Sequence, residues 1–126
     1  MRKDHTVWKI FGGYLLVILL MLLSSTASGQ SPCGGSGLCV AQFNAGFNEA
    51  NGVKWVVDLD ECETAFIDIM KDTKASSKYK IVVVPTILIF NGSEEVARYQ
   101  ANIMMVMEST QKEVQGKIDE IIMEDF

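Results

Sequence analysis

Short runs of apolar residues, each bounded by polar or turn-forming residues, predict four strands. Residues 38–44 are apolar enough for a strand buried on both faces, and apolar side chains in residues 64–69 recur with the period of two typical of a strand. Residues 81–90 form the most apolar stretch outside the N-terminal segment. The Asn91-Gly92 step after them is a strong hairpin signal. It leads into residues 95–100, where charged side chains suit an edge strand.

Three further segments carry helical signals. Residues 53–61 have apolar side chains at helical spacing, although several are β-branched and weaken the pattern. Asp72 or Thr73 can cap a short helix that continues to Tyr79. The last helix begins with a capping box in which Thr110 precedes Glu113 by three residues. Its single apolar stripe consists of Val114, Ile118, Ile121 and Ile122. This order of elements predicts an α/β domain in which helices flank a central mixed β-sheet.

The first 29 residues have the pattern of a secretory signal peptide. A basic start is followed by an uncharged apolar run, and Ala27 and Gly29 have the spacing of a signal-peptidase site. Export to the periplasm or the extracellular space is therefore expected. The apolar stretch of residues 10–23 is shorter than the ~20 residues of a comfortable membrane span, and a retained membrane anchor there is the alternative. Residues 30–37 are rich in glycine and serine and predict a flexible tether, which leaves residues 38–126 for the domain.

Composition and charge exclude several classes of function. The chain has a formal charge of −5, which becomes −7 without residues 1–29, and no cluster of Lys and Arg follows one face, so nucleic-acid binding is not expected. The only histidine, His5, lies in the predicted signal peptide. This excludes a Ser-His-Asp triad, a Cys-His pair and a His-ligated zinc site from the folded part. We expect no metal and no other cofactor.

One segment resembles the thioredoxin family. Residues 78–92, Lys-Tyr-Lys-Ile-Val-Val-Val-Pro-Thr-Ile-Leu-Ile-Phe-Asn-Gly, are similar to the family's stretch from its third helix through the cis-proline strand into the hairpin. Residues 67–69 fall where the family has the strand before that helix, and residues 40–45 fall where it has the central strand. The resemblance implies a single thioredoxin-like domain with a cis-proline, Pro85, before the hairpin strands.

The same resemblance places Phe-Asn-Glu-Ala-Asn, residues 47–51, at the loop where thioredoxins carry Trp-Cys-Gly-Pro-Cys. Asn48 and Asn51 then stand at the positions of the redox dithiol, and Gln42 stands at the position of the family's buried acid. An amide has neither the nucleophilicity nor the redox couple of a thiolate. We therefore expect no catalytic residue and no dithiol redox activity, with Asn48 capping the short helix behind it.

The resemblance also implies a binding surface made of Phe47, Asn48, Val84, Pro85 and Thr86. An extended peptide or protein partner would pair there with the main chain of the proline segment. The alternative is that Pro85 only maintains the geometry of the fold. Membrane contact is expected only if the N-terminal segment is retained.

The three cysteines leave several readings open. Cys33 and Cys39 are separated by six positions across a glycine-rich turn and could close a disulfide in an oxidising compartment, which leaves Cys62 unpaired. Cys39 could instead be an inert core residue. The expected function is a peptide-binding, protein-binding or structural module. The alternative is an oxidoreductase-like protein of the cell envelope that uses Cys33, Cys39 or Cys62.

An apolar cluster lies between the last strand and the last helix. It contains Ile103, Met104, Met105 and Met107. Methionine side chains fill irregular gaps and also serve on adaptable binding surfaces. The cluster therefore either packs against the core or forms a lip beside a peptide-binding site.

Overall fold

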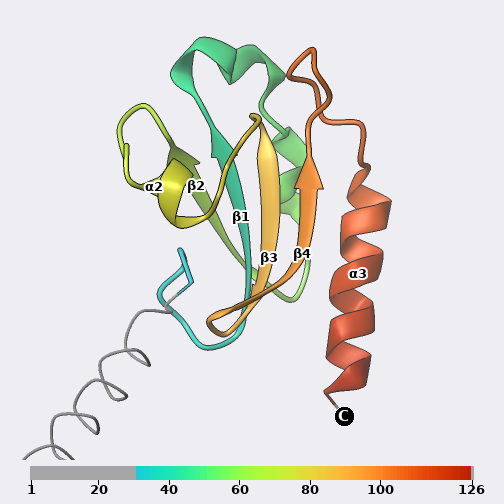
Figure 1. Cartoon of the computed structure of the whole chain (residues 1–126). Coiled ribbons are helices and arrows are strands. Elements are labelled where there is room, and N and C mark those ends of the chain that lie inside the picture. The colour runs from blue at the N-terminus through green and yellow to red at the C-terminus, as the bar shows by residue number, and fades with distance from the viewer. Residues whose placement is uncertain (1–30, 126) are drawn as a thin grey trace, which may run out of the picture.

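The computed structural model describes residues 31–125, in which helical segments surround one four-stranded sheet (Figure 1). The elements in chain order are β1 (Leu38–Asn44), the 3-10 helices η1 (Gly46–Asn51) and η2 (Lys54–Asp58), β2 (Glu63–Asp68), α2 (Ala75–Lys78), β3 (Thr86–Asn91), β4 (Glu94–Gln100) and α3 (Gln111–Glu124). The expectations for residues 1–29 fall outside the described residues.

The strands are ordered β2-β1-β3-β4 across the sheet. β1 pairs in parallel with β2 and antiparallel with β3, and β3 pairs antiparallel with β4. Helices lie on both sides of this mixed sheet, so the predicted α/β class is confirmed. Of the helices among residues 31–125, none is long and apolar enough to cross a membrane.

Local turn chemistry explains how β3 and β4 are joined. Gly92 has a φ of +64°, a left-handed conformation that glycine adopts without a steric cost, and it follows Asn91 at the end of β3. The predicted hairpin is thus confirmed. At the other end of β3, the Val84–Pro85 peptide bond is cis.

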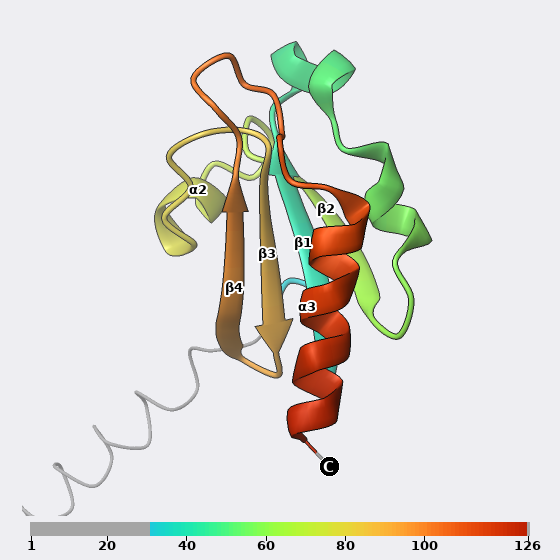
Figure 2. The ribbon, with the colours of Figure 1, turned by 90° about the vertical axis from the view of Figure 1, so that its right-hand side faces the viewer.

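Two apolar clusters fill the spaces on the two faces of the sheet. One face packs Val40, Ile87 and Ile89 against η2 and α3, and Figure 2 shows α3 lying along this side. The other face packs Ala41, Phe43, Leu88 and Phe90 against α2 and Tyr79. The sheet therefore lies between a thin layer around α2 and a thicker layer of η2 and α3.

The C-terminal helix forms as its sequence predicts. The Thr110 side chain accepts a hydrogen bond from the Glu113 main-chain nitrogen at 3.2 Å, which satisfies one free donor of the first turn. Val114, Ile118 and Ile121 of the apolar stripe are buried against the sheet. Burial of this stripe fixes α3 on its face of the sheet.

Two other helices are shorter than the pattern predicts. The expected helix over residues 53–61 is only the 3-10 helix Lys54–Asp58, and the helix expected to end at Tyr79 is the single turn Ala75–Lys78. Val53, Val56 and Val57 are β-branched and lose side-chain freedom in an α-helix. Burial of Val53 and Val56 in the core fixes the segment without a regular helix.

Candidate functional site

The residues with candidate chemistry lie at the two ends of β1. Cys39 is near its start, and Asn44 at its end leads into η1 with Phe47, Asn48 and Asn51. Asn44 is five residues further along the strand than Cys39, which is about 17 Å. Cys39 and the asparagines therefore lie at opposite ends of the sheet.

Asn48 is the centre of the asparagine end. Its side chain is only 4% exposed, and its Nδ2 lies 3.3 Å from the Val84 main-chain oxygen, 3.2 Å from the Met105 main-chain oxygen and 3.2 Å from Asn44 Oδ1. Asn51 donates to Asn48 Oδ1 at 2.9 Å. Asn48 is not an N-cap, because η1 begins after Ala45 and has no side-chain cap. Its amide instead joins three segments of the chain.

Gln42 lies at the position that the resemblance gives to a buried acid. It is buried in β1, accepts a hydrogen bond from the Val53 nitrogen at 2.7 Å and donates to the Val53 oxygen at 2.9 Å. An amide can do both at once, whereas a carboxylate can only accept. Gln42 thus holds the start of the η2 segment against β1.

The five residues of the expected binding surface come together at this end of the sheet, but most of them are covered. Phe47 is 70% exposed, while Asn48, Val84, Pro85 and Thr86 are buried. The Val84 oxygen already accepts from Asn48. An extended peptide that paired with Val84 would therefore compete with the Asn48 side chain, and peptide binding here stays a prediction.

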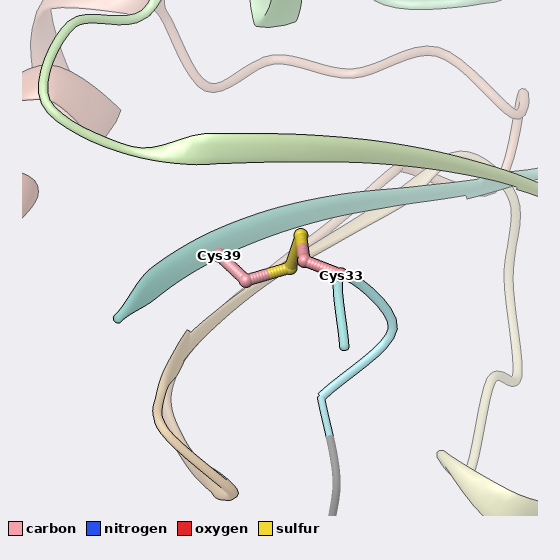
Figure 3. The surroundings of a disulfide bond; sticks show 2 residues. All are labelled: Cys33 and Cys39. Carbon is pink, nitrogen blue, oxygen red and sulfur yellow. A yellow bond between two sulfur atoms is a disulfide. The ribbon is translucent and has the colours of Figure 1, made fainter. Parts of the chain in front are cut away.

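At the other end of β1, Cys33 and Cys39 form a disulfide with a Cα–Cα separation of 5.9 Å (Figure 3). This finding corrects the expectation of a chain without dithiol redox activity. That expectation was based on the loop at residues 47–51, where no cysteine is present, and left a couple of Cys33 and Cys39 as the alternative. A disulfide and its dithiol are a redox couple wherever they lie in a fold, so the loss of one cysteine pair does not make the chain redox-inactive.

The two sulfurs of this disulfide differ in their surroundings. Cys39 is buried in the cluster below α2, whereas Cys33 is half-buried and leads into the exposed residues 34–37. Cys39 is paired with Glu63 of β2, and the Glu63 carboxylate lies against Gly35 of the loop. The expected tether is therefore attached to β1 and β2 at this point.

Cys62 is the free cysteine and lies just before β2. It packs beside the cluster on the α3 face, while Cys39 belongs to the cluster on the opposite face. Burial raises the pKa of the Cys62 thiol, and the nearby Asp60 carboxylate raises it further. Both effects disfavour the thiolate of Cys62, and the sheet separates this thiol from the disulfide.

Two asparagines that organise this end of the sheet were missed by the sequence analysis. Asn44 donates to the Asn48 oxygen at 3.1 Å, and the Asn102 side chain accepts from two nitrogens of the loop after β4. The available signal is weak in both cases. Asn44 ends β1 and Asn102 lies two residues beyond the end of β4, and asparagine commonly bonds to nearby main chain at such positions.

Comparisons with known proteins support the fold. No protein-family model matches the chain, and no curated protein matches it. Among solved structures, a mutant thioredoxin from Halobacterium salinarum NRC-1 matches with a TM-score of 0.52 and 18% identity, over 73% of this chain and 86% of that one. A thioredoxin from Fasciola hepatica matches with a TM-score of 0.51 and 21% identity, over 68% and 81%.

Two further structures extend this result. A thioredoxin-2 of the malaria parasite matches with a TM-score of 0.53 and 14% identity, over 67% of this chain and 82% of that one. A designed protein matches with a TM-score of 0.54 and 16% identity, over 82% and 91%. At such low identities the similarity concerns the fold alone. Together with the mixed sheet and its flanking helices, it shows that this chain has a thioredoxin-like fold.

Proposed function

We propose that this chain is a thiol–disulfide protein whose redox couple is Cys33 and Cys39. The observation that carries the proposal is the disulfide between these two residues, at the start of β1. The loop that it closes, residues 34–37, is exposed, and Cys33 is its more accessible cysteine. Access of a second thiolate to one sulfur is the first requirement of thiol–disulfide exchange.

The difference in burial sets the order of the two half-reactions. A thiolate of a reducing partner attacks Cys33 Sγ, the Cys33–Cys39 bond breaks, and Cys39 leaves as a thiolate that takes a proton from water. A second thiol of the partner then displaces Cys33 from the mixed disulfide, so that two electrons and two protons reach the protein. In the reverse direction, the Cys33 thiolate attacks a partner disulfide and Cys39 resolves the intermediate.

We also propose that the chain is exported and that residues 1–29 are a signal peptide cleaved after Gly29. A disulfide between Cys33 and Cys39 supports this location, because disulfides persist in oxidising compartments such as the periplasm and the extracellular space. Retention of residues 10–23 as an anchor is the competing arrangement. The intact mass of the protein from its native host distinguishes the two.

The redox proposal is tested by equilibrating the protein in glutathione buffers and counting thiols by a mass-shifting alkylation. We expect reversible reduction with a potential above about −300 mV, together with reduction of a model disulfide substrate. Cys33→Ser should abolish turnover, and Cys62→Ser is the matched control that should retain it. A potential below about −300 mV would mark the bond as purely structural and refute the proposal.

A second measurement tests the order of attack. Cys39→Ser leaves Cys33 without its resolving partner, so this variant should accumulate a stable mixed disulfide with a chromogenic aromatic disulfide. Cys33→Ser leaves the buried Cys39 and should react much more slowly, and both variants carry Cys62→Ser so that the free cysteine does not contribute. Equal rates for the two variants would contradict the assignment of Cys33 as the attacked sulfur.

A further inference from the structure

The outer edge of β2 has no neighbouring strand among residues 31–125. β2 lies at one side of the sheet and β4 at the other, as Figure 2 shows, and β2 pairs with β1 alone among these residues. Ile69, the residue after β2, donates its main-chain nitrogen to the Asn44 oxygen at 3.0 Å. Alternate residues of a strand bond to the same neighbour. The main-chain groups of Thr64, Phe66 and Asp68 therefore face away from β1.

These outward residues have main-chain groups to offer to a further strand. Among the described residues, no hydrogen bond outside the sheet reaches the main chain of Thr64 or Phe66. The Asp68 oxygen accepts from the Lys71 and Asp72 nitrogens, at 3.0 and 2.9 Å, and this turn ends the strand. The edge therefore offers the nitrogens and oxygens of Thr64 and Phe66, and the nitrogen of Asp68.

The two edges of the sheet differ in their regularity. The pairing of β3 with β4 has a register shift between Ile89 and Phe90, and an irregularity of this kind blunts an edge strand against further pairing. β1 and β2 pair in unbroken register over the whole of β2, which contains neither proline nor lysine. β2 is thus a regular strand that a further strand can join.

Phe66 places a large apolar side chain in the middle of this edge. It is 56% exposed, and Val57 of η2 is 61% exposed. Both line a hollow beside β2, whose charged lining residues are Glu49, Lys54, Asp68 and Lys71. The acids and bases of this hollow balance each other. The hollow therefore offers a partner apolar contact rather than a net charge.

The charges at the two ends of β2 decide the direction of an added copy of the strand. The acidic side chains of residues 58–63 are all exposed and have no basic residue among them; they are Asp58, Asp60, Glu61 and Glu63. Residues 68–74 combine Lys71 and Lys74 with two aspartates. Two copies of β2 in parallel would bring their acidic ends together. An antiparallel pair places each acidic end beside the lysines of the other copy.

We propose that the β2 strands of two copies of this chain pair antiparallel about a two-fold axis at Phe66. In this register Phe66 lies opposite its own copy, Thr64 opposite Asp68, and Ala65 opposite Ile67, so no like charges face each other within β2. A register centred on Asp68 would instead place two carboxylates opposite each other. Each β2 edge is used once, so assembly stops at the dimer. This pairing does not rest on the redox proposal.

Sedimentation velocity of the whole chain over a range of concentrations tests the association. Every protein carries Cys62→Ser, so that no disulfide of this free cysteine imitates the dimer. We expect a reversible monomer–dimer equilibrium with a Kd on the order of micromolar, because the shared edge is small. Assembly beyond the dimer, or a monomer at every concentration up to about 100-fold above such a Kd, would overturn the proposal.

Two matched variants locate the contact. Phe66→Lys and Met123→Lys each replace a highly exposed apolar residue by a base, and Met123 lies on α3. At the two-fold axis the new ammonium groups face each other, so Phe66→Lys should weaken the dimer at least about tenfold. Met123→Lys should leave it unchanged. Both variants keep the same N-terminus, so association through that segment would be equal in the two and would contradict the proposal.

Cysteine cross-linking tests the register and the direction of the strands. Directly opposite Cα atoms of an antiparallel pair lie about 5.5 Å apart, within the range of a disulfide, whereas the two copies of residue 64 would lie roughly 14 Å apart. In the Cys62→Ser background, Phe66→Cys should therefore form a covalent dimer at least about tenfold faster than Thr64→Cys. Equal rates would indicate a parallel pair or random collision and would overturn the assignment.

Discussion

The Asn48 side-chain amide lies 3.2 Å from the main-chain oxygen of Met105, a residue 57 positions further along the chain. The same nitrogen lies 3.3 Å from the Val84 oxygen, next to Pro85. Because Asn48 and Val84 are both buried, the Val84 carbonyl has little access to water and depends on the amide. The position at which the thioredoxin resemblance implies a redox cysteine is therefore used here to hold two loops together.

Removal of this amide should destabilise the domain. Asn48→Ala leaves the Val84 and Met105 carbonyls without their donor, and the expected loss in the free energy of unfolding is about 1–3 kcal/mol. Urea denaturation of the two proteins measures it. Lys112→Ala is the control, because Lys112 is an exposed residue of α3, and its effect should stay within about 0.5 kcal/mol. Equal stabilities of Asn48→Ala and wild type would contradict the role given to Asn48.

Gln42→Glu should introduce a pH-dependent loss of stability. The neutral acid can still donate to the Val53 oxygen and accept from its nitrogen, but the carboxylate can only accept and is costly to bury. The pKa of the new acid is therefore raised in the folded state. The free energy of unfolding of Gln42→Glu should be close to that of wild type at about pH 4. It should fall as the pH rises towards about pH 7, because the new acid ionises at a lower pH in the unfolded chain than in the folded one.

Urea denaturation of Gln42→Glu and wild type at both pH values checks this sign. Glu is nearly isosteric with Gln, so packing changes contribute little to the difference. A stability difference that does not change with pH would show that the hydrogen bonds to Val53 do not discriminate between the two forms.

The Cys33–Cys39 disulfide should stabilise the domain as well as carry the proposed redox couple. Closure of this short loop restricts the unfolded chain, and its loss should lower the free energy of unfolding by about 2 kcal/mol. Urea denaturation with and without dithiothreitol measures the effect. The loss of stability caused by dithiothreitol should persist in Cys62→Ser, which keeps the disulfide. It should vanish in the double variant that combines Cys33→Ser with Cys39→Ser. A reductant effect that survives in this double variant would refute the explanation.

Cys62 should be alkylated slowly at neutral pH. Its pKa is raised by burial and by Asp60, so the reactive thiolate forms only at a higher pH than in an unfolded peptide. The rate of iodoacetamide modification against pH, followed by intact mass, should have its midpoint above that of the protein unfolded in urea. Asp60→Asn removes one of the two causes and should shift the midpoint downward. A midpoint equal to that of the unfolded protein would contradict this assignment.

The fold could be predicted from the sequence to a large extent because its signals are local. The Asn91-Gly92 turn, the Thr110–Glu113 cap and the buried stripe of α3 each depend on residues within a few positions of one another. A helical segment over residues 53–61 was predicted, but its shortening to the 3-10 helix Lys54–Asp58 was not, because packing of Val53 and Val56 into the core overrides a weak local helical preference.

The sequence by itself determined the order of the elements and the α/β class, the asparagines in the loop at residues 47–51, and a cysteine spacing compatible with a disulfide. Only the tertiary structure decided that Asn48 bonds to Val84 and Met105, that the disulfide lies at the far end of β1 from this site, and that Ile103 and Met104 project outward. The reason is that turn chemistry and side-chain periodicity act over a few residues. Hydrogen bonds across 36 or 57 positions, and the exposure of a loop, depend on where the whole chain places its segments.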